Sequence, residues 1–109
     1  NNYNEISFTG SLEDDVLAQC HRVFTSIFRT KIKTADIGIS TSHTFSTGTP
    51  SSTQYDLQSV ITHEVGHALG LGHPDDTERT AVMYKSFAPG ETRRTLSSDD
   101  IAGIAAIYD

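Results

Sequence analysis

Hydrophobic residues recur with two different periods along the first third of the chain. Over residues 3–8 apolar and polar residues partly alternate, which predicts a first strand. Over residues 12–29 the apolar positions recur at helical spacing, and acidic residues stand where the positive end of a helix dipole would be. We therefore predict a long amphipathic helix over residues 12–29. Cys20 falls on its apolar stripe and is interpreted as inert core, whereas His21 beside the stripe is interpreted as surface.

The middle of the chain alternates between strand, loop and helix patterns. Residues 35–40, Ala-Asp-Ile-Gly-Ile-Ser, predict a strand. Residues 41–53 are rich in Ser, Thr and Gly and predict a loop with one short edge strand over residues 43–47. A second helix is predicted from Asp56 to Leu69. Its expected packing residues are Leu57, Val60, Ile61, Val65 and Ala68.

A last helix begins at Ser97, where a capping signal precedes an apolar run. Ser97 is the predicted N-cap and Asp100 stands at the third helical position. The predicted buried face consists of Ile101, Ile104, Ala105 and Tyr108. The order of strands and helices predicts a single small domain over residues 1–109, of the α+β or mixed α/β class.

Composition excludes some classes of function. The net charge is −6, with 14 acidic and 8 basic residues, and no basic stripe could neutralise phosphates, so nucleic acid is not expected as a partner. No apolar run approaches the roughly 20 residues that span a membrane. Cys20 is the single cysteine, so no internal disulfide can form and stability must come from packing and from a bound metal.

Candidate chemistry is concentrated in residues 63–73, where three histidines and one glutamate stand at metal-site spacing. His63 and His67 are one helical turn apart, so both project from the same helix face. Gly70 can end the helix and let the chain return with His73 as a third ligand. Three neutral nitrogens leave a fourth zinc position for water, which is typical of catalytic rather than structural sites. Glu64 lies beside the metal, where it can act as general base and then as general acid.

These parts suit hydrolysis of a peptide bond, although an ester or another amide could be cleaved by the same groups. His43 has no partner at ligand spacing and is interpreted as polar surface. Two alternatives to a hydrolase remain open. One is a zinc-holding binding or inhibitory module that has lost turnover. The other is a purely structural metal domain, for which Asp75 and Asp76 are poorly placed candidates for a fourth ligand.

The extended motif His-Glu-x-x-His-x-x-Gly-x-x-His resembles the signature of the metzincin clan of zinc endopeptidases. In that clan a turn with a methionine, the methionine turn, follows the motif, and Val82-Met83-Tyr84 resembles it. Residues 35–39, 55–60 and 96–104 are most similar to matrixins. The resemblance implies a small twisted mixed sheet with a backing helix, an active-site helix and a C-terminal helix below a cleft. It also implies that Met83 forms an apolar floor under the ligands without binding the metal.

The same resemblance implies protein or peptide substrates that bind extended along an edge strand, with a pocket for an apolar side chain near the methionine turn. By analogy we expect a secreted or extracellular monomer. The segment between Ile39 and Asp56 is too short for the structural-zinc and calcium loops of matrixins, so we expect one catalytic zinc and leave calcium undecided. Lys85 occupies the place where some metzincins carry a tyrosine ligand, and Tyr84 is expected to be structural.

Overall fold

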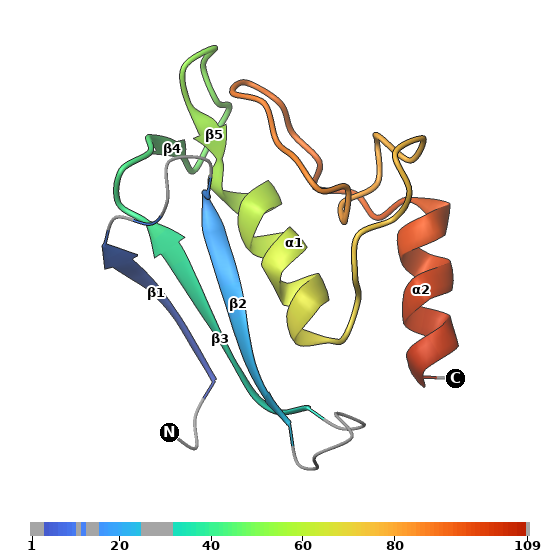
Figure 1. The fold of residues 1–109 in the computed structure, drawn as a ribbon. Coiled ribbons are helices and arrows are strands. Elements are labelled where there is room, and N and C mark those ends of the chain that lie inside the picture. Colours follow the sequence, from blue (N-terminus) through green and yellow to red (C-terminus); the bar gives the residue numbers. More distant parts are fainter. Residues whose placement is uncertain (1–3, 11, 13–15, 25–31, 109) are drawn as a thin grey trace.

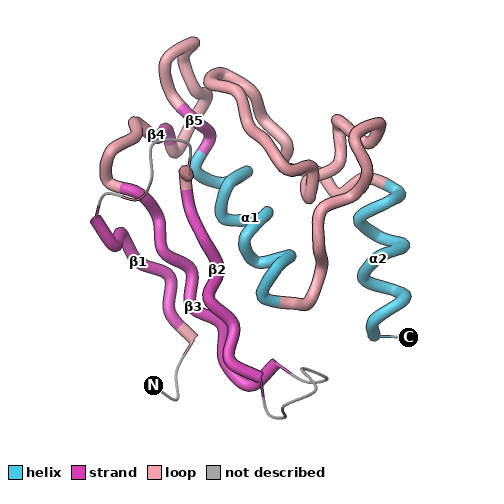
Figure 2. The backbone as a smooth tube through the Cα atoms, viewed as in Figure 1, coloured by secondary structure: helices cyan, strands magenta, loops and turns pink. Residues whose placement is uncertain are grey.

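Strands dominate the first half of the domain and helices the second half (Figure 1). The computed structural model describes residues 4–10, 12, 16–24 and 32–108. The elements in chain order are β1 (Glu5–Gly10), β2 (Ala18–Phe24), β3 (Ile32–Ser40), β4 (Phe45–Ser46), β5 (Tyr55–Asp56), α1 (Leu57–Ala68) and α2 (Ser98–Tyr108). Figure 2 shows α1 lying between the sheet and α2. This arrangement confirms the predicted α+β class.

The main sheet has the strand order β1-β3-β2, so β3 is central and β2 is an edge strand. β1 runs parallel to β3, with Phe8 opposite Ile39, and β2 runs antiparallel to it, with Cys20 opposite Ile37. Ile37 and Ile39 are almost fully buried. The strands predicted over residues 3–8 and 35–40 are therefore confirmed, although β1 continues to Gly10, residue 3 lies outside the described residues, and β3 begins three residues earlier than the pattern indicates.

The long helix predicted over residues 12–29 is wrong where the structure describes it, because residues 18–24 form β2. Along β2 half-buried and exposed side chains alternate, with Gln19, His21 and Val23 exposed. Its apolar residues fit either period, and pairing with β3 along the whole strand decides between them. The rest of that segment lies largely outside the described residues. The described part of the chain therefore contains no backing helix of the kind that the resemblance implies.

Helix α1 begins and ends through specific caps. The Asp56 carboxylate accepts hydrogen bonds from the Ser59 backbone N–H at 3.1 Å and from its hydroxyl at 2.5 Å. At the other end Gly70 has φ 108°, a conformation that favours glycine. The backbone N–H groups of Gly70 and Leu71 donate to the carbonyls of His67 and Gly66, which is a Schellman motif. The predicted helix over residues 56–69 is thus confirmed to within a residue.

Helix α2 begins with the predicted capping box. The Asp100 N–H donates to Ser97 Oγ at 3.1 Å, and the Ser97 N–H donates to Asp100 Oδ2 at 2.8 Å. The predicted buried face is wrong in part, since Ile101 and Tyr108 are 56% and 60% exposed. Asp100 and Gly103 face the interior instead, with Leu71 directly against Gly103. The spacing of apolar residues cannot reveal that a carboxylate and a glycine, instead of two apolar side chains, face the interior.

A second, two-stranded sheet pairs β4 with β5 in parallel. The edge strand predicted over residues 43–47 is confirmed by β4, whereas β5 was not predicted. Phe45 and Tyr55 pack ring against ring across this pair, with centroids 6.3 Å apart. In the described part of the chain, neither helix combines the length and the apolar character needed to cross a membrane.

Candidate metal centre

Three histidine side chains converge at the C-terminal half of α1 and the loop that follows it. His63 and His67 come from successive turns of α1, and His73 is delivered by the loop that leaves the Schellman turn. The Nε2 atom of His67 lies 3.2 Å from Nε2 of His63 and 3.1 Å from Nε2 of His73. Within the described residues these three form a group able to hold a metal ion. The structure thus brings together the three ligands that the sequence predicts.

Hydrogen bonds on the far side of two rings fix their protonation. His63 Nδ1 lies 2.8 Å from the Val82 carbonyl oxygen, and His67 Nδ1 lies 2.8 Å from that of Leu71. A carbonyl can only accept, so each Nδ1 carries the proton and each Nε2 presents a lone pair to the centre. Burial lowers the pKa of His63 to about 4 and also lowers the pKa of His67. Both rings are therefore held in the neutral form that binds metal.

The donor set fits zinc. Because neither Nε2 of His63 nor that of His67 carries a proton, the two atoms cannot hydrogen-bond at their separation of 3.2 Å and repel each other unless a cation lies between them. Tetrahedral zinc with bonds near 2.05 Å places its ligand nitrogens roughly 3.3 Å apart. Asp75 instead accepts from the backbone and hydroxyl of Thr77, and Asp76 pairs with Lys85 at 2.8 Å. Neither aspartate belongs to the histidine group, which argues against a four-ligand structural site.

Glu64 lies next to this group and lines the same cleft as the three histidines. Its side chain is buried, at 7% exposure, and burial raises its pKa to about 7. A carboxyl group with such a pKa can take up and release a proton near neutral pH. The position and the proton affinity of Glu64 therefore both suit acid–base chemistry.

The turn formed by residues 81–84 packs under the histidines. Met83 is 3% exposed and lies against α1 at Gly66, where a Cβ atom would overlap its Sδ and approach its Cε to 3.0 Å. The Asp100 carboxylate accepts hydrogen bonds from the backbone N–H groups of Val82 at 2.8 Å and Met83 at 3.2 Å. Met83 thus packs on the helix that carries His63 and His67, its role as a floor beneath the ligands stays a prediction, and the neighbouring Tyr84 is buried.

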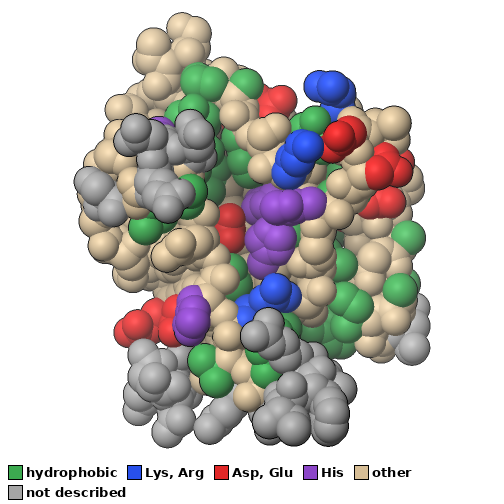
Figure 3. Space-filling view, viewed as in Figure 1, with side chains coloured by type: hydrophobic (Ala, Val, Ile, Leu, Met, Phe, Trp, Pro, Cys, Tyr) green, Lys and Arg blue, Asp and Glu red, His purple; other side chains and the backbone are tan. Residues whose placement is uncertain are grey.

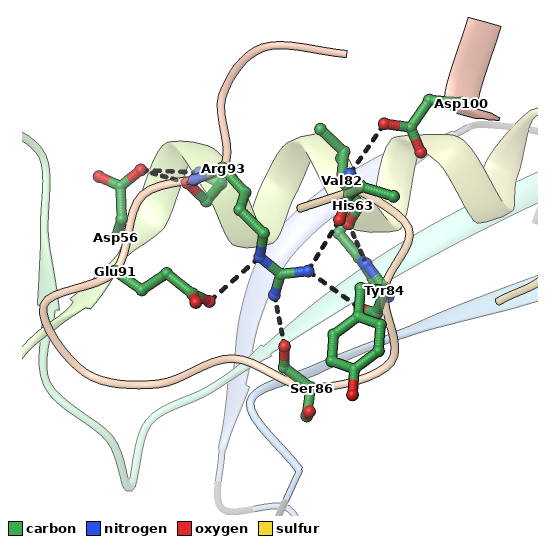
Figure 4. Close-up of polar contacts among 10 residues, drawn as sticks. Asp56, His63, Val82, Tyr84, Ser86, Glu91, Arg93 and Asp100 are labelled. Atoms are coloured by element: carbon green, nitrogen blue, oxygen red, sulfur yellow. Dashed lines mark hydrogen bonds and ion pairs between the residues drawn. The ribbon is translucent and has the colours of Figure 1, made fainter. Parts of the chain in front are cut away.

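Arg93 is a further residue of this region, and the sequence analysis did not identify it. Its side chain is buried and its guanidinium lies in the bend that carries Tyr84 and Ser86 (Figure 4). Burial lowers the pKa of Arg93, while the neighbouring Glu91 carboxylate raises it. No spacing rule marks a lone arginine in a polar stretch, so only the folded structure reveals its position.

A cleft of about 620 Å³ contains the histidines and Glu64. The edge strand β2 and the segment preceding it line one side, and residues 85–87 line another. Figure 3 shows the histidine cluster exposed on this face, with basic side chains on two sides of it and an acidic side chain beside it. Cys20, expected in a helix core, lies half-buried in the cleft wall. His43, expected on the surface, is half-buried there too, its ring edge-on to Tyr55 at 5.7 Å.

Comparisons with known proteins agree with this geometry. A family model described as Matrixin matches residues 5–109. Metalloendoproteinase 1 of Glycine max is 45% identical over 62 residues, which are 57% of this chain and 20% of that protein. Neutrophil collagenase of Homo sapiens is 48% identical over 63 residues, which are 57% of this chain and 13% of that protein. Metalloendoproteinase 1-MMP of Arabidopsis thaliana is 49% identical over 53 residues, covering 49% and 14% of the two chains. The matched region is therefore a fifth or less of each relative.

Proposed function

Because the chain belongs to the matrixin family, we propose that it is a zinc-dependent endopeptidase that hydrolyses peptide bonds. One observation carries the proposal: the Nε2 atoms of His63, His67 and His73 meet in a cleft that Glu64 also lines. His63, His67 and His73 would hold one zinc ion. When bound there, zinc lowers the pKa of a water molecule and polarises a carbonyl oxygen.

The residues of the chain supply the remaining chemistry. The Glu64 carboxylate accepts a proton from the attacking water and passes it to the nitrogen of the departing amine. The carbonyls of Val82 and Leu71 keep the His63 and His67 rings in the tautomer that turns Nε2 toward the metal. By the family resemblance, the buried Met83 would form an apolar floor beneath these ligands.

Substrates would be proteins or peptides that lie extended in the cleft. The edge strand β2 pairs only with β3 among the described strands, and residues 18–20 and 22 of it line the cleft. An edge strand presents unpaired backbone N–H and C=O groups, which can bind an extended peptide as an added strand. A secreted or extracellular location, expected from the family, is part of this proposal.

A paired experiment separates this function from a zinc-holding inhibitory or binding module. The zinc content of wild type and of Glu64→Ala would be measured by mass spectrometry, and both would be incubated with casein and a peptide library. We expect about one zinc per chain in both proteins and cleavage by wild type alone. If zinc-loaded wild type cleaves nothing above the Glu64→Ala background, the endopeptidase proposal fails and the binding module is favoured.

A further inference from the structure

We propose that Arg93 is a positioning residue that holds the cleft wall formed by residues 84–87 and thereby determines which apolar substrate side chain the cleft accepts. The inference rests on the proposed peptidase function, because it concerns selection among peptides. It assigns a role to a residue outside the zinc-ligand motif and outside the methionine turn.

The guanidinium of Arg93 binds three backbone carbonyl groups, one at Ala81 just before the wall and two in the wall itself. Nη1 donates to the carbonyl oxygens of Ala81 at 2.9 Å and Tyr84 at 3.3 Å, and Nη2 donates to that of Ser86 at 2.5 Å (Figure 4). Residues 81–87 form turns and irregular structure, without a helix or a strand ladder to fix their carbonyl groups. Hydrogen bonds from the buried cation take the place of such a ladder.

The same guanidinium also fixes an aromatic ring of the cleft. It lies 4.0 Å from the centroid of the Phe87 ring, and that ring packs edge-on against the His63 ring with centroids 5.3 Å apart. Phe87 lines the cleft together with Ser86. A shift of the guanidinium would therefore move an apolar surface that directly adjoins a proposed zinc ligand.

Two buried charged side chains bind the backbone of residues 81–86, one through its N–H groups and the other through its carbonyl groups. Asp100 accepts from backbone N–H groups at Val82 and Met83, below the metal site, whereas Arg93 donates to carbonyl groups from Ala81 to Ser86. Arg93 is itself anchored, because its backbone N–H donates to Ser59 Oγ at 2.7 Å on α1. The wall is thus connected to the active-site helix through Arg93.

Lysine cannot reproduce these contacts, since an ammonium lacks the planar fork that serves several carbonyls while stacking on a ring. Nε of Arg93 is already occupied by Glu91, at 3.1 Å, on the outer side. The inward-facing nitrogens are therefore committed to the wall. Arg93→Lys keeps the positive charge and tests this geometry, and Arg93→Met tests the loss of both charge and fork.

The experiment measures selection rather than total activity. Wild type, Arg93→Lys and Arg93→Met would be assayed on peptides that differ only in one apolar side chain next to the scissile bond, from Ala to Leu to Phe. We expect KM for the preferred peptide to rise about tenfold in the variants and the preference among the peptides to flatten. A merely structural role would lower the active fraction, and with it kcat, while leaving KM and the preference unchanged.

Arg94→Met is the matched control, because Arg94 is exposed and pairs with Asp56 at the start of α1 instead of with the wall. The Arg94→Met protein should be less stable than wild type but should keep the same preference among the peptides. In the Phe87→Ala background, Arg93→Lys should have a smaller effect on the preference than in wild type, since the ring is gone and only the hydrogen bonds to the backbone of the wall remain. Equal effects of Arg93→Lys with and without Phe87 would assign the role to the backbone hydrogen bonds alone, whereas an unchanged preference in both Arg93 variants would overturn the proposal.

A binding measurement keeps this test separate from the test of catalysis. Fluorescence anisotropy of the same peptides with zinc-loaded Glu64→Gln, with and without Arg93→Lys, reports selection without turnover. Graded affinity in Glu64→Gln that is lost on adding Arg93→Lys supports the role of Arg93 even if wild type cleaves no peptide. Absence of graded binding in Glu64→Gln overturns the role of Arg93, whereas cleavage by wild type would still uphold the proposed function.

Discussion

Replacing Gly66 by alanine should destabilise the domain although alanine is the better helix former. Gly66 is buried in α1, one residue before His67, and Met83 lies directly against its Cα. A methyl group there would overlap Met83 Sδ and lie 3.0 Å from Cε and 3.5 Å from Cγ. Met83 is 3% exposed, so its side chain could move away only within the packed interior.

The magnitude follows from two opposing contributions. Replacing glycine by alanine inside a helix stabilises by about 1 kcal/mol. Forcing a methyl group into a packed core costs about 1–3 kcal/mol, and overlap with two atoms of one buried side chain places this case near the upper end. We therefore expect Gly66→Ala to lower the free energy of unfolding by about 1–2 kcal/mol, measured by urea denaturation of the metal-free protein.

Two comparisons make this expectation testable. Gly103→Ala in α2 is the matched control, because the added methyl would meet only the end of the Leu71 side chain, at 2.9 Å. It should be neutral or stabilising by up to about 1 kcal/mol. In the Met83→Ala background the penalty of Gly66→Ala should vanish, giving a coupling energy of at least about 1 kcal/mol. A Gly66→Ala protein as stable as wild type would refute the close packing of Met83 on α1.

Three further outcomes are expected. Asp100→Asn should destabilise by about 2–3 kcal/mol in urea denaturation, because three backbone N–H groups share its carboxylate, whereas the exposed Asp99→Asn should change stability by about 0.5 kcal/mol or less. In metal-free protein, lowering of the His63 pKa from 6.5 to about 4 makes stability rise with pH over that interval, while raising of the Glu64 pKa from 4.5 to about 7 opposes it. Glu64→Gln should therefore show the steeper gain in unfolding free energy between pH 4 and pH 6.5, and equal slopes in the two proteins would contradict the raised pKa of Glu64. Zinc added in excess should raise the thermal midpoint in scanning fluorimetry, and a chelator should reverse it; no shift would argue against a native-state zinc site.

The sequence predicted the metal centre better than the strands and the loop that surround it. The motif residues His63, His67 and Gly70 act within a few positions of one another, so helix geometry and a glycine turn suffice to place them. The capping box at Ser97 was predictable for the same reason. Local chemistry determines these features almost completely.

Features that depend on distant partners were not predictable. Residues 18–24 fit both a helical and a strand pattern, and pairing with β3 made them a strand. The roles of Arg93 and of the Asp100 carboxylate at the methionine turn depend on contacts with residues 7 to 18 positions away, which no local pattern encodes. The half-buried position of His43 in the cleft likewise follows from its contact with Tyr55.

The double use of Asp100 has a consequence for local unfolding. Its carboxylate caps the first turn of α2 and at the same time binds the N–H groups of Val82 and Met83. Fraying of that first turn would release the amides under the His63 ring, so the C-terminal helix and the metal floor open as one cooperative segment. Amide hydrogen exchange at positions 82 and 83 should therefore report on the integrity of a helix that begins fifteen residues later.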